Sequence, residues 1–227
     1  MIRLSKASKM PCRSWSLEAL DTCAGSRDIN GELVAACQGC YATTGNYRFP
    51  NVKAPRVENK SDWKRADWVD DMVKALDNDR YFRWFDSGDM YSLRLAWKIY
   101  EVMLLTPWVR HWLPTRMHKF SKFQTVLEMM RALPNVSVRA SSDSVSGEFD
   151  DRHGSTIIPD LVGPVRYFRA ELVDQWAKKN KVVSCSAIDN KGKCGDCRKC
   201  WSKDISVIGY FAHGQKMKKV ISIKSKG

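Results

Sequence analysis

Apolar and polar residues in the middle of the chain follow two alternating periods. Three segments place apolar residues at helical spacing and are predicted helices: 61–76, 92–105 and 119–133. Each is followed by a short run rich in aromatic and β-branched residues, and these runs are predicted strands: 81–85, 109–113 and 136–140. The alternation indicates βα units and a parallel sheet, open or curled into part of a barrel.

The two ends of the chain have weaker patterns. The first sixty residues show no sustained period and are predicted to be rich in loops. After residue 146 we expect strands near 157–158, 181–183 and 205–210 and a helix over 171–179. The expected α/β fold is a partial (βα) barrel over residues 1–163, with a cysteine-rich region, residues 164–227, packed on the same core.

Polar residues lie at the ends of the three predicted strands in the middle of the chain. They are Asp86-Ser87-Gly88-Asp89, Thr115-Arg116 and Arg139-Ala140-Ser141-Ser142-Asp143. Ligands of parallel α/β folds lie beyond the carboxyl ends of the strands. The sequence therefore predicts a binding site at this edge of the sheet.

Charge and hydropathy add a location and a class of partner. No apolar run approaches the ~20 residues that cross a bilayer, so we expect a cytoplasmic protein without a membrane partner. The net charge is +13, and residues 164–227 hold 15 basic and 5 acidic side chains. This basic third favours nucleic acid or another polyanion as a partner, although a solvated tail over 216–226 would give the same composition.

The chain contains eight cysteines, most of them in two groups. In a reducing compartment such clusters are typical of metal binding, whereas disulfides are the alternative in an oxidising one. Cys37 and Cys40 form a CxxC pair with a glycine at the turn, and Cys23 is the third ligand expected near them. Three thiolates would leave one position open on a [4Fe–4S] cluster or on zinc. For Cys12 we expect no ligand role.

The C-terminal group is the more specific one. It joins the continuous run Cys194-x-x-Cys197-x-x-Cys200 to Cys185. Structural zinc sites usually use two separated CxxC pairs, whereas a continuous CxxCxxC is typical of a cubane iron–sulfur cluster. An iron–sulfur cluster is thus favoured over zinc. Among the histidines, only His213 lies close enough in sequence to be a further candidate ligand.

Several motifs together resemble the phage-encoded gene product 88 family over most of the chain. They are Cys37-x-x-Cys40-Tyr41-Ala42, Arg83-Trp84-Phe85-Asp86-Ser87-Gly88-Asp89, Trp112-Leu113-Pro114-Thr115-Arg116, Val138-Arg139-Ala140-Ser141 and Cys194-Gly195-x-Cys197-x-x-Cys200-Trp201. That family is similar in turn to radical SAM proteins, in which three cysteines hold a [4Fe–4S] cluster inside a partial (βα) barrel. In those enzymes the remaining iron binds S-adenosylmethionine, which is cleaved reductively. A phage origin would place the protein in the host cytoplasm.

The resemblance implies a role for each matching residue. Cys23, Cys37 and Cys40 would hold the open cluster, and the C-terminal cysteines would hold an auxiliary one. The residues implied to line the S-adenosylmethionine site are Tyr41, Ser87, Gly88, Asp89, Arg116, Arg139, Ser141 and Asp143. The chain departs from the radical SAM pattern in two places: 13 residues lie between Cys23 and Cys37, where CxxxCxxC is usual, and Ser-Gly replaces a glycine pair.

Two functions follow as hypotheses. One is an iron–sulfur enzyme of the radical SAM kind that modifies a nucleic acid or a protein bound to the basic third. The other is a non-enzymatic module stabilised by zinc or iron–sulfur, which binds nucleic acid or a host protein during infection. The polar strand ends favour the first, and the unusual cysteine spacing favours the second.

Overall fold

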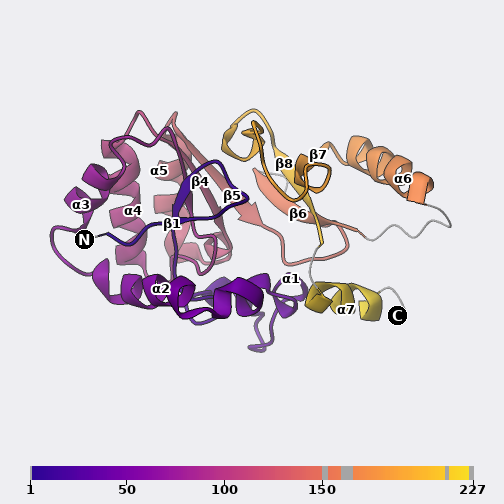
Figure 1. Ribbon diagram of the computed structural model, residues 1–227, viewed down its shortest axis with the longest axis horizontal. Coiled ribbons are helices and arrows are strands. Elements are labelled where there is room, and N and C mark those ends of the chain that lie inside the picture. The colour runs from indigo at the N-terminus through magenta and orange to yellow at the C-terminus, as the bar shows by residue number, and fades with distance from the viewer. Residues whose placement is uncertain (1, 150–152, 160–165, 213–214, 225–227) are drawn as a thin grey trace.

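One mostly parallel sheet organises the molecule (Figure 1). The computed structural model describes residues 2–149, 153–159, 166–212 and 215–224. The strand order is β1-β2-β3-β4-β5-β6-β8-β7, with β1 and β2 antiparallel and the other neighbours parallel. The strands are β1 (Ser5–Lys6), β2 (Arg13–Trp15), β3 (Tyr81–Trp84), β4 (Arg110–Thr115), β5 (Val136–Ser141), β6 (Gly154–Ile158), β7 (Val182–Ser184) and β8 (Val207–Phe211). Over the described residues the sheet is open, since β1 and β7 lie at its two edges.

Helices lie on one face of the sheet and along its carboxyl end. The α-helices of the described residues are α1 (Ala35–Gln38), α2 (Pro50–Asp62), α3 (Trp68–Ala75), α4 (Leu93–Leu105), α5 (Gln124–Ala132), α6 (Arg166–Lys179) and α7 (Gln215–Lys224). Helices α3, α4 and α5 lie together on one side of β3, β4 and β5, while α2, α1 and α7 follow one another along the lower end (Figure 1). None of the described helices is long and apolar enough to span a bilayer.

The main core lies between the sheet and helices α3 to α5. Side chains alternate along a strand, so Phe82 and Trp84 of β3 face the helices while Arg83 faces the other way. Trp15 of β2 packs edge-on against Trp84, with ring centroids 6.2 Å apart. Burial of these large side chains fixes which face of each central strand is covered by helices.

The opposite face of the sheet, called the inner face below, is covered by the C-terminal cysteine segment. Trp201 follows Cys200 directly and is 4% exposed. Its indole Nε1–H donates to the carbonyl oxygen of Phe82 at 2.9 Å, and its ring meets that of Trp112 at 5.3 Å. Cys12 is buried in the same apolar cluster. The C-terminal region therefore packs on the sheet that the first half of the chain begins.

Two of the predicted helices start later than expected. The predicted helix 61–76 is divided, because α2 ends at Asp62 and α3 starts at Trp68. Arg65 holds the intervening turn, with its guanidinium 2.7 Å from an oxygen of Asp62 and 2.8 Å from one of Asp71. The predicted helix 119–133 begins only at Gln124, after two single 3-10 turns.

The expected loops near both ends contain regular structure. Helix α2 begins at Pro50, a residue suited to the first turn because its missing N–H would have no partner there. A solvated tail over 216–226 was the alternative to a polyanion contact, but residues 216–224 belong to α7, whose Met217 and Ile221 are buried against Ala35. His213 and the predicted region boundary at residue 163 lie outside the described residues.

Candidate functional site

The N-terminal cysteine loop lies over the carboxyl ends of β3, β4 and β5. Ala36, next to Cys37, donates its N–H to the carbonyl oxygen of Asp143 just after β5, at 2.9 Å. The Tyr41 hydroxyl donates to the carbonyl oxygen of Asp86 just after β3, at 2.5 Å. These bonds join two strand ends to a loop that is far away in sequence, so the predicted edge of the sheet is where this cysteine group lies.

The three thiols of this loop are close enough to influence one another. Burial raises the pKa of Cys23 to about 12, and the negative charges of Asp89, Cys37 and Cys40 act in the same direction. Burial also raises the pKa of Cys37, which the positive charge of Arg116 opposes. The raised pKa values of Cys23 and Cys37 keep both thiols protonated at neutral pH, so a metal bound here would displace the protons and compensate the buried thiolates with its own charge.

Asp89 is the centre of the hydrogen bonds at this edge. One carboxylate oxygen accepts from the Thr115 hydroxyl and from the Met90 N–H, both at 2.8 Å. The other accepts from the Arg116 N–H at 2.9 Å. Burial raises the pKa of Asp89 even though these three donors favour its charged form. The Asp89 side chain thus fastens the end of β3 to the end of β4.

Arg116 and Lys119 share the carboxylate of Asp143. The Arg116 Nε–H donates at 3.1 Å and the Lys119 ammonium at 2.5 Å, to different oxygens. A second Arg116 donor reaches the carbonyl oxygen of Ser142 at 2.7 Å. Ser141 is the last residue of β5 and pairs with Ser155 in β6. Arg116, Ser141 and Asp143 therefore lie at the edge where the sequence predicted them.

A buried ion pair lies beneath the same loop. The Arg56 guanidinium from α2 donates to both oxygens of Asp86, at 2.7 and 3.0 Å, and both side chains are about 5% exposed. The Arg56 Nε–H donates to the Ser87 hydroxyl at 2.8 Å, which donates in turn to the carbonyl oxygen of Leu17 at 2.7 Å. Tyr47 adds a hydrogen bond to Asp86 at 3.1 Å. This network ties α2 and the cysteine loop to the end of β3.

Gly88 allows the strand-end turn to pack closely on the Cys23 loop. Its φ of +77° is in the left-handed region. A Cβ at this position would lie 2.6 Å from the Cβ of Leu17 and 2.7 Å from the hydroxyl oxygen of Thr22. A larger residue would therefore push the Cys23 loop away from the turn.

The C-terminal cysteines form a second group, on the inner face of the sheet. The Cys194 N–H donates to the carbonyl oxygen of Lys9 at 2.9 Å. The Cys200 sulfur lies 3.3 Å from the Tyr210 hydroxyl, and burial raises the pKa of this thiol to about 11. Burial also raises the pKa of Cys194, and the neighbouring thiols of Cys185 and Cys197 add to the rise. All four predicted ligands are thus neighbours.

Arg139 belongs to this second group and not to the edge with Asp89. It is fully buried, and its side chain points to the inner face of β5. Its guanidinium donates to the carbonyl oxygens of Cys200 at 3.0 Å, Ser202 at 2.7 Å and Ile205 at 3.0 Å. In this structure Arg139 holds the backbone of the C-terminal cysteine segment.

The thiols do not form a ready site for one ion. Across the described ranges, no three His, Cys, Asp or Glu side chains form a group that could hold a single metal ion. Zinc bound by four thiolates at about 2.3 Å needs sulfurs only about 3.8 Å apart. The thiolates of a cubane bind different irons and stand further apart.

Sequence reasoning missed Arg56, Tyr47 and Lys119. Arg56 and Asn59 face inward from α2, and their side chains are almost fully buried. The Phe49-Pro50 step was a signal that could have located the start of this helix, and with it the buried face. Lys119 was assigned to a helix, but it lies in a turn where its ammonium reaches Asp143.

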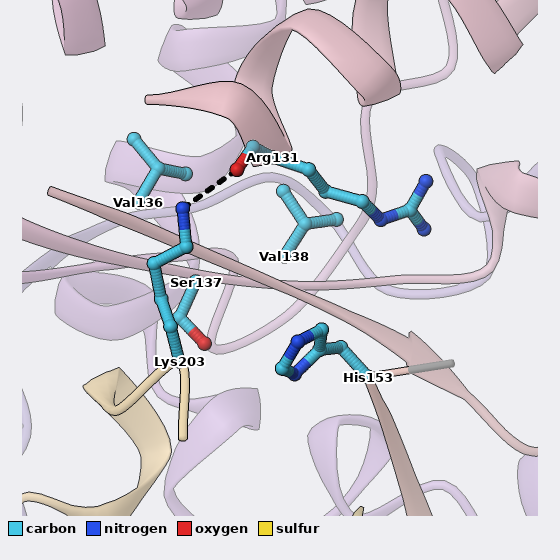
Figure 2. Close-up of a pocket in the computed structure, with 6 residues that line it drawn as sticks. All are labelled: Arg131, Val136, Ser137, Val138, His153 and Lys203. Carbon is cyan, nitrogen blue, oxygen red and sulfur yellow. Dashed lines mark hydrogen bonds between the residues drawn. The ribbon is translucent and has the colours of Figure 1, made fainter. Parts of the chain in front are cut away.

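A small cavity lies at the other end of β5. Its volume is about 60 Å³, and it is lined by Arg131, Val136, Ser137, Val138, His153 and Lys203 (Figure 2). The Lys203 ammonium binds the carboxyl-terminal end of α5, where it donates to the carbonyl oxygens of Arg131 at 2.7 Å and Leu133 at 2.8 Å. None of the predicted site residues lines this cavity.

Comparison with known proteins gives one match. A family model described as gene product 88 matches residues 2–203, which cover both cysteine groups and all the strand ends discussed above. No curated protein and no solved structure matches the chain significantly.

Proposed function

The chain belongs to the gene product 88 family, and we propose that it is an iron–sulfur protein with two cubane clusters, one of which has an open iron. The position of the N-terminal thiols carries this proposal. Cys23, Cys37 and Cys40 are neighbours, and their loop is bonded to the carboxyl ends of parallel strands. Ligands of parallel α/β folds are found at this end of the sheet, and three thiolates leave one iron of a cubane without a protein ligand.

The open cluster is proposed to work as in radical SAM enzymes. When bound, such a cluster supplies an electron to S-adenosylmethionine held at its open iron. The side chains of Ser87 and Asp89 are occupied by Arg56, Thr115 and neighbouring backbone, so they would hold the strand-end turn in place. Its backbone groups, together with Tyr41, Arg116, Ser141 and Asp143, are the proposed contacts for the cofactor.

The second cluster is assigned to Cys185, Cys194, Cys197 and Cys200. With four thiolates every iron would be ligated, which suits a structural or auxiliary role. The basic residues of 164–227 surround this group in sequence and are the proposed contact for a nucleic acid or protein substrate. Zinc remains the alternative metal for these four cysteines.

One observation favours a non-enzymatic module as the second candidate. The charged groups at the strand ends are largely paired with one another, as in Arg56 with Asp86 and Arg116 with Asp143. Such a network fits a metal-stabilised scaffold whose basic region binds nucleic acid or a host protein. In that case the clusters, or zinc, contribute folding energy and no turnover.

Anaerobic purification of the full chain tests the proposal. We expect a coloured protein that contains iron and acid-labile sulfide in equal amounts. Cys37→Ser and Cys197→Ser should each lose about half of the iron, since each removes a ligand of a different cluster. Cys12→Ser is the matched control and should keep all of it. A colourless protein with stoichiometric zinc would contradict the proposal.

The enzymatic part needs its own assay. With dithionite and S-adenosylmethionine, the iron-loaded protein should produce 5′-deoxyadenosine, and Cys37→Ser should not. Cys197→Ser that still holds the first cluster should retain at least some of this cleavage. An iron-loaded protein that yields no 5′-deoxyadenosine would support the non-enzymatic module.

A further inference from the structure

Helix α7 brings basic side chains next to the N-terminal cysteine loop. Its Met217 and Ile221 are buried in one apolar cluster with Ala35 of α1, the helix that also contains Cys37. Gly39, which follows this helix, leaves room for α7, since a Cβ there would lie 2.6 Å from the Cα of Met217. Figure 1 shows α7 beside α1. The lysines of α7 are therefore held close to the loop that carries the proposed open cluster.

Lys216 and Lys219 lie on the exposed side of α7. They are three positions apart, so their side chains are neighbours on the helix surface. The Lys216 ammonium donates to the hydroxyl oxygen of Thr43 at 3.1 Å, in the 3-10 turn η2 (Tyr41–Thr43) that follows Cys40. Neither lysine forms an ion pair with a carboxylate of the described residues. Both charges can therefore bind an anion from outside the chain.

The two segments that form this surface contain no acidic residue. The sequence has no Asp or Glu in residues 33–57 or in residues 205–224. Arg48 in the first segment is exposed and lacks a carboxylate partner among the described residues. Lys53 reaches the carboxylate of Glu18 only at 3.5 Å. Two segments far apart in sequence thus place positive charge on one surface, which favours a polyanion as its partner.

The turn that contains Arg48 also leads to an exposed aromatic ring. The 3-10 turn η3 (Gly45–Arg48) packs on η2, and Phe49 joins it to α2. Phe49 is 56% exposed. The bases of a single strand stack on such rings, whereas the bases of a duplex are already stacked on one another. A ring beside exposed cations therefore favours a single-stranded nucleic acid over a duplex.

A lipid surface is a poorer partner for α7. Basic amphipathic helices bind anionic membranes by burying their apolar face among the lipids. The apolar face of α7 is already occupied, since Met217 and Ile221 are only 6% and 8% exposed. The charged side of the helix is what a partner can reach, and the phosphate groups of a nucleic acid need no apolar face.

We propose that Lys216, Lys219, Arg48 and Phe49, together called the α7 face, bind single-stranded nucleic acid. The three cations contact phosphate groups, and a base stacks on the Phe49 ring. The inference rests on the proposed function in that it names the substrate. It brings this substrate to the side of the molecule that carries Cys40, and within the basic third it makes the lysines of α7 the contacts.

Binding of a labelled single strand to the full chain tests this inference. The probes are an oligothymidine of about 16 nucleotides and the oligouridine of the same length, and fluorescence anisotropy gives the dissociation constant at several salt concentrations. Lys216→Gln combined with Lys219→Gln should weaken binding about tenfold or more. Because two phosphate contacts are lost, the slope of log K against log salt should become shallower by about 1.4. Lys216→Arg combined with Lys219→Arg keeps the charge and should bind as the wild type does.

The aromatic contact is tested separately. Phe49→Ala should weaken binding about fivefold or more and leave the salt slope unchanged, since stacking releases no counterions. The matched control is Lys64→Gln combined with Lys74→Gln, two exposed lysines just before and within α3, at the other end of the molecule from α7 (Figure 1). This control removes the same charge and should retain the wild-type affinity.

Each other result has a defined meaning. An equal loss of affinity in the α3 control would overturn the α7 face and indicate binding through net charge alone. A duplex, phosphatidylserine vesicles or polyglutamate that displaces the probe as well as an unlabelled single strand does would overturn single-stranded nucleic acid as the partner. Iron-loaded wild type that does not bind the probe overturns the inference but leaves the proposed function intact. A wild type without iron and sulfide refutes the proposed function, while its oligonucleotide affinities still decide the inference.

Discussion

Removing the positive partner of the buried Asp86 should be one of the most damaging single changes at the candidate site. In Arg56→Met the carboxylate of Asp86 stays buried and loses both guanidinium hydrogen bonds, at 2.7 and 3.0 Å. Among the side-chain hydroxyls near it, the carboxylate keeps the Tyr47 donor at 3.1 Å, because the single Ser87 proton goes to the carbonyl oxygen of Leu17. Breaking a buried pair in this way typically costs about 3–5 kcal/mol, because an uncompensated charge remains inside.

Urea unfolding followed by tryptophan fluorescence measures this cost. With a slope of about 3 kcal/mol per molar urea, the midpoint of Arg56→Met should fall by about 1 M or more. Arg3→Met is the matched control, since its arginine pairs with Glu58 where both side chains are about half exposed, and it should change stability by less than about 1 kcal/mol. Adding Asp86→Asn to Arg56→Met should recover part of the loss. Equal small shifts for both arginine variants would refute the argument that burial decides the energy.

Three further perturbations test other parts of the structure. Burial lowers the pKa of His111 to about 3, whereas this histidine binds a proton near pH 6.5 in the unfolded chain. The free energy of unfolding should therefore fall as the pH drops below about 6.5, by up to about 1.4 kcal/mol per pH unit. His111→Gln should flatten this dependence, and equal pH dependence of stability in the variant and the wild type would contradict the prediction. Gly39→Ala would place a Cβ 2.6 Å from the Cα of Met217 and push α7 away from this loop. The backbone amides of α7 should then exchange their hydrogens faster, and unchanged exchange would count against this contact. Trp201→Ala should lower the free energy of unfolding in urea by about 3–5 kcal/mol and expose the C-terminal cysteines to alkylation. A loss below about 1 kcal/mol would show that this segment is not anchored through Trp201.

Hydrophobic periodicity located the central elements well. The strands β3, β4 and β5 and helix α4 appear within two residues of their predicted positions, because each has one strongly apolar face. Helix α2 was missed for the opposite reason. Its buried positions include Arg56 and Asn59, polar residues whose partners lie elsewhere in the chain, so a search for apolar periodicity passes over them.

The candidate site was predicted in part. The spacing of cysteines and the polar strand ends identified Cys37, Asp89, Arg116 and Asp143 as neighbours, because parallel strands end at a common edge. Arg139 was placed with them, since it lies near the end of an apolar strand. It lies two residues before the end of β5 and its side chain points to the inner face, so its contacts are with the C-terminal segment.

By itself the sequence determined the α/β alternation, the edge of the sheet that carries polar groups and the division of the cysteines into two groups. These features depend on local spacing, which a linear pattern contains. Only the tertiary structure decided that the C-terminal cysteine segment covers the inner face of the sheet and that Arg56 neutralises Asp86. Those contacts join residues 30 to 119 positions apart, and their energies depend on burial and charge balance that exist only after the chain has folded.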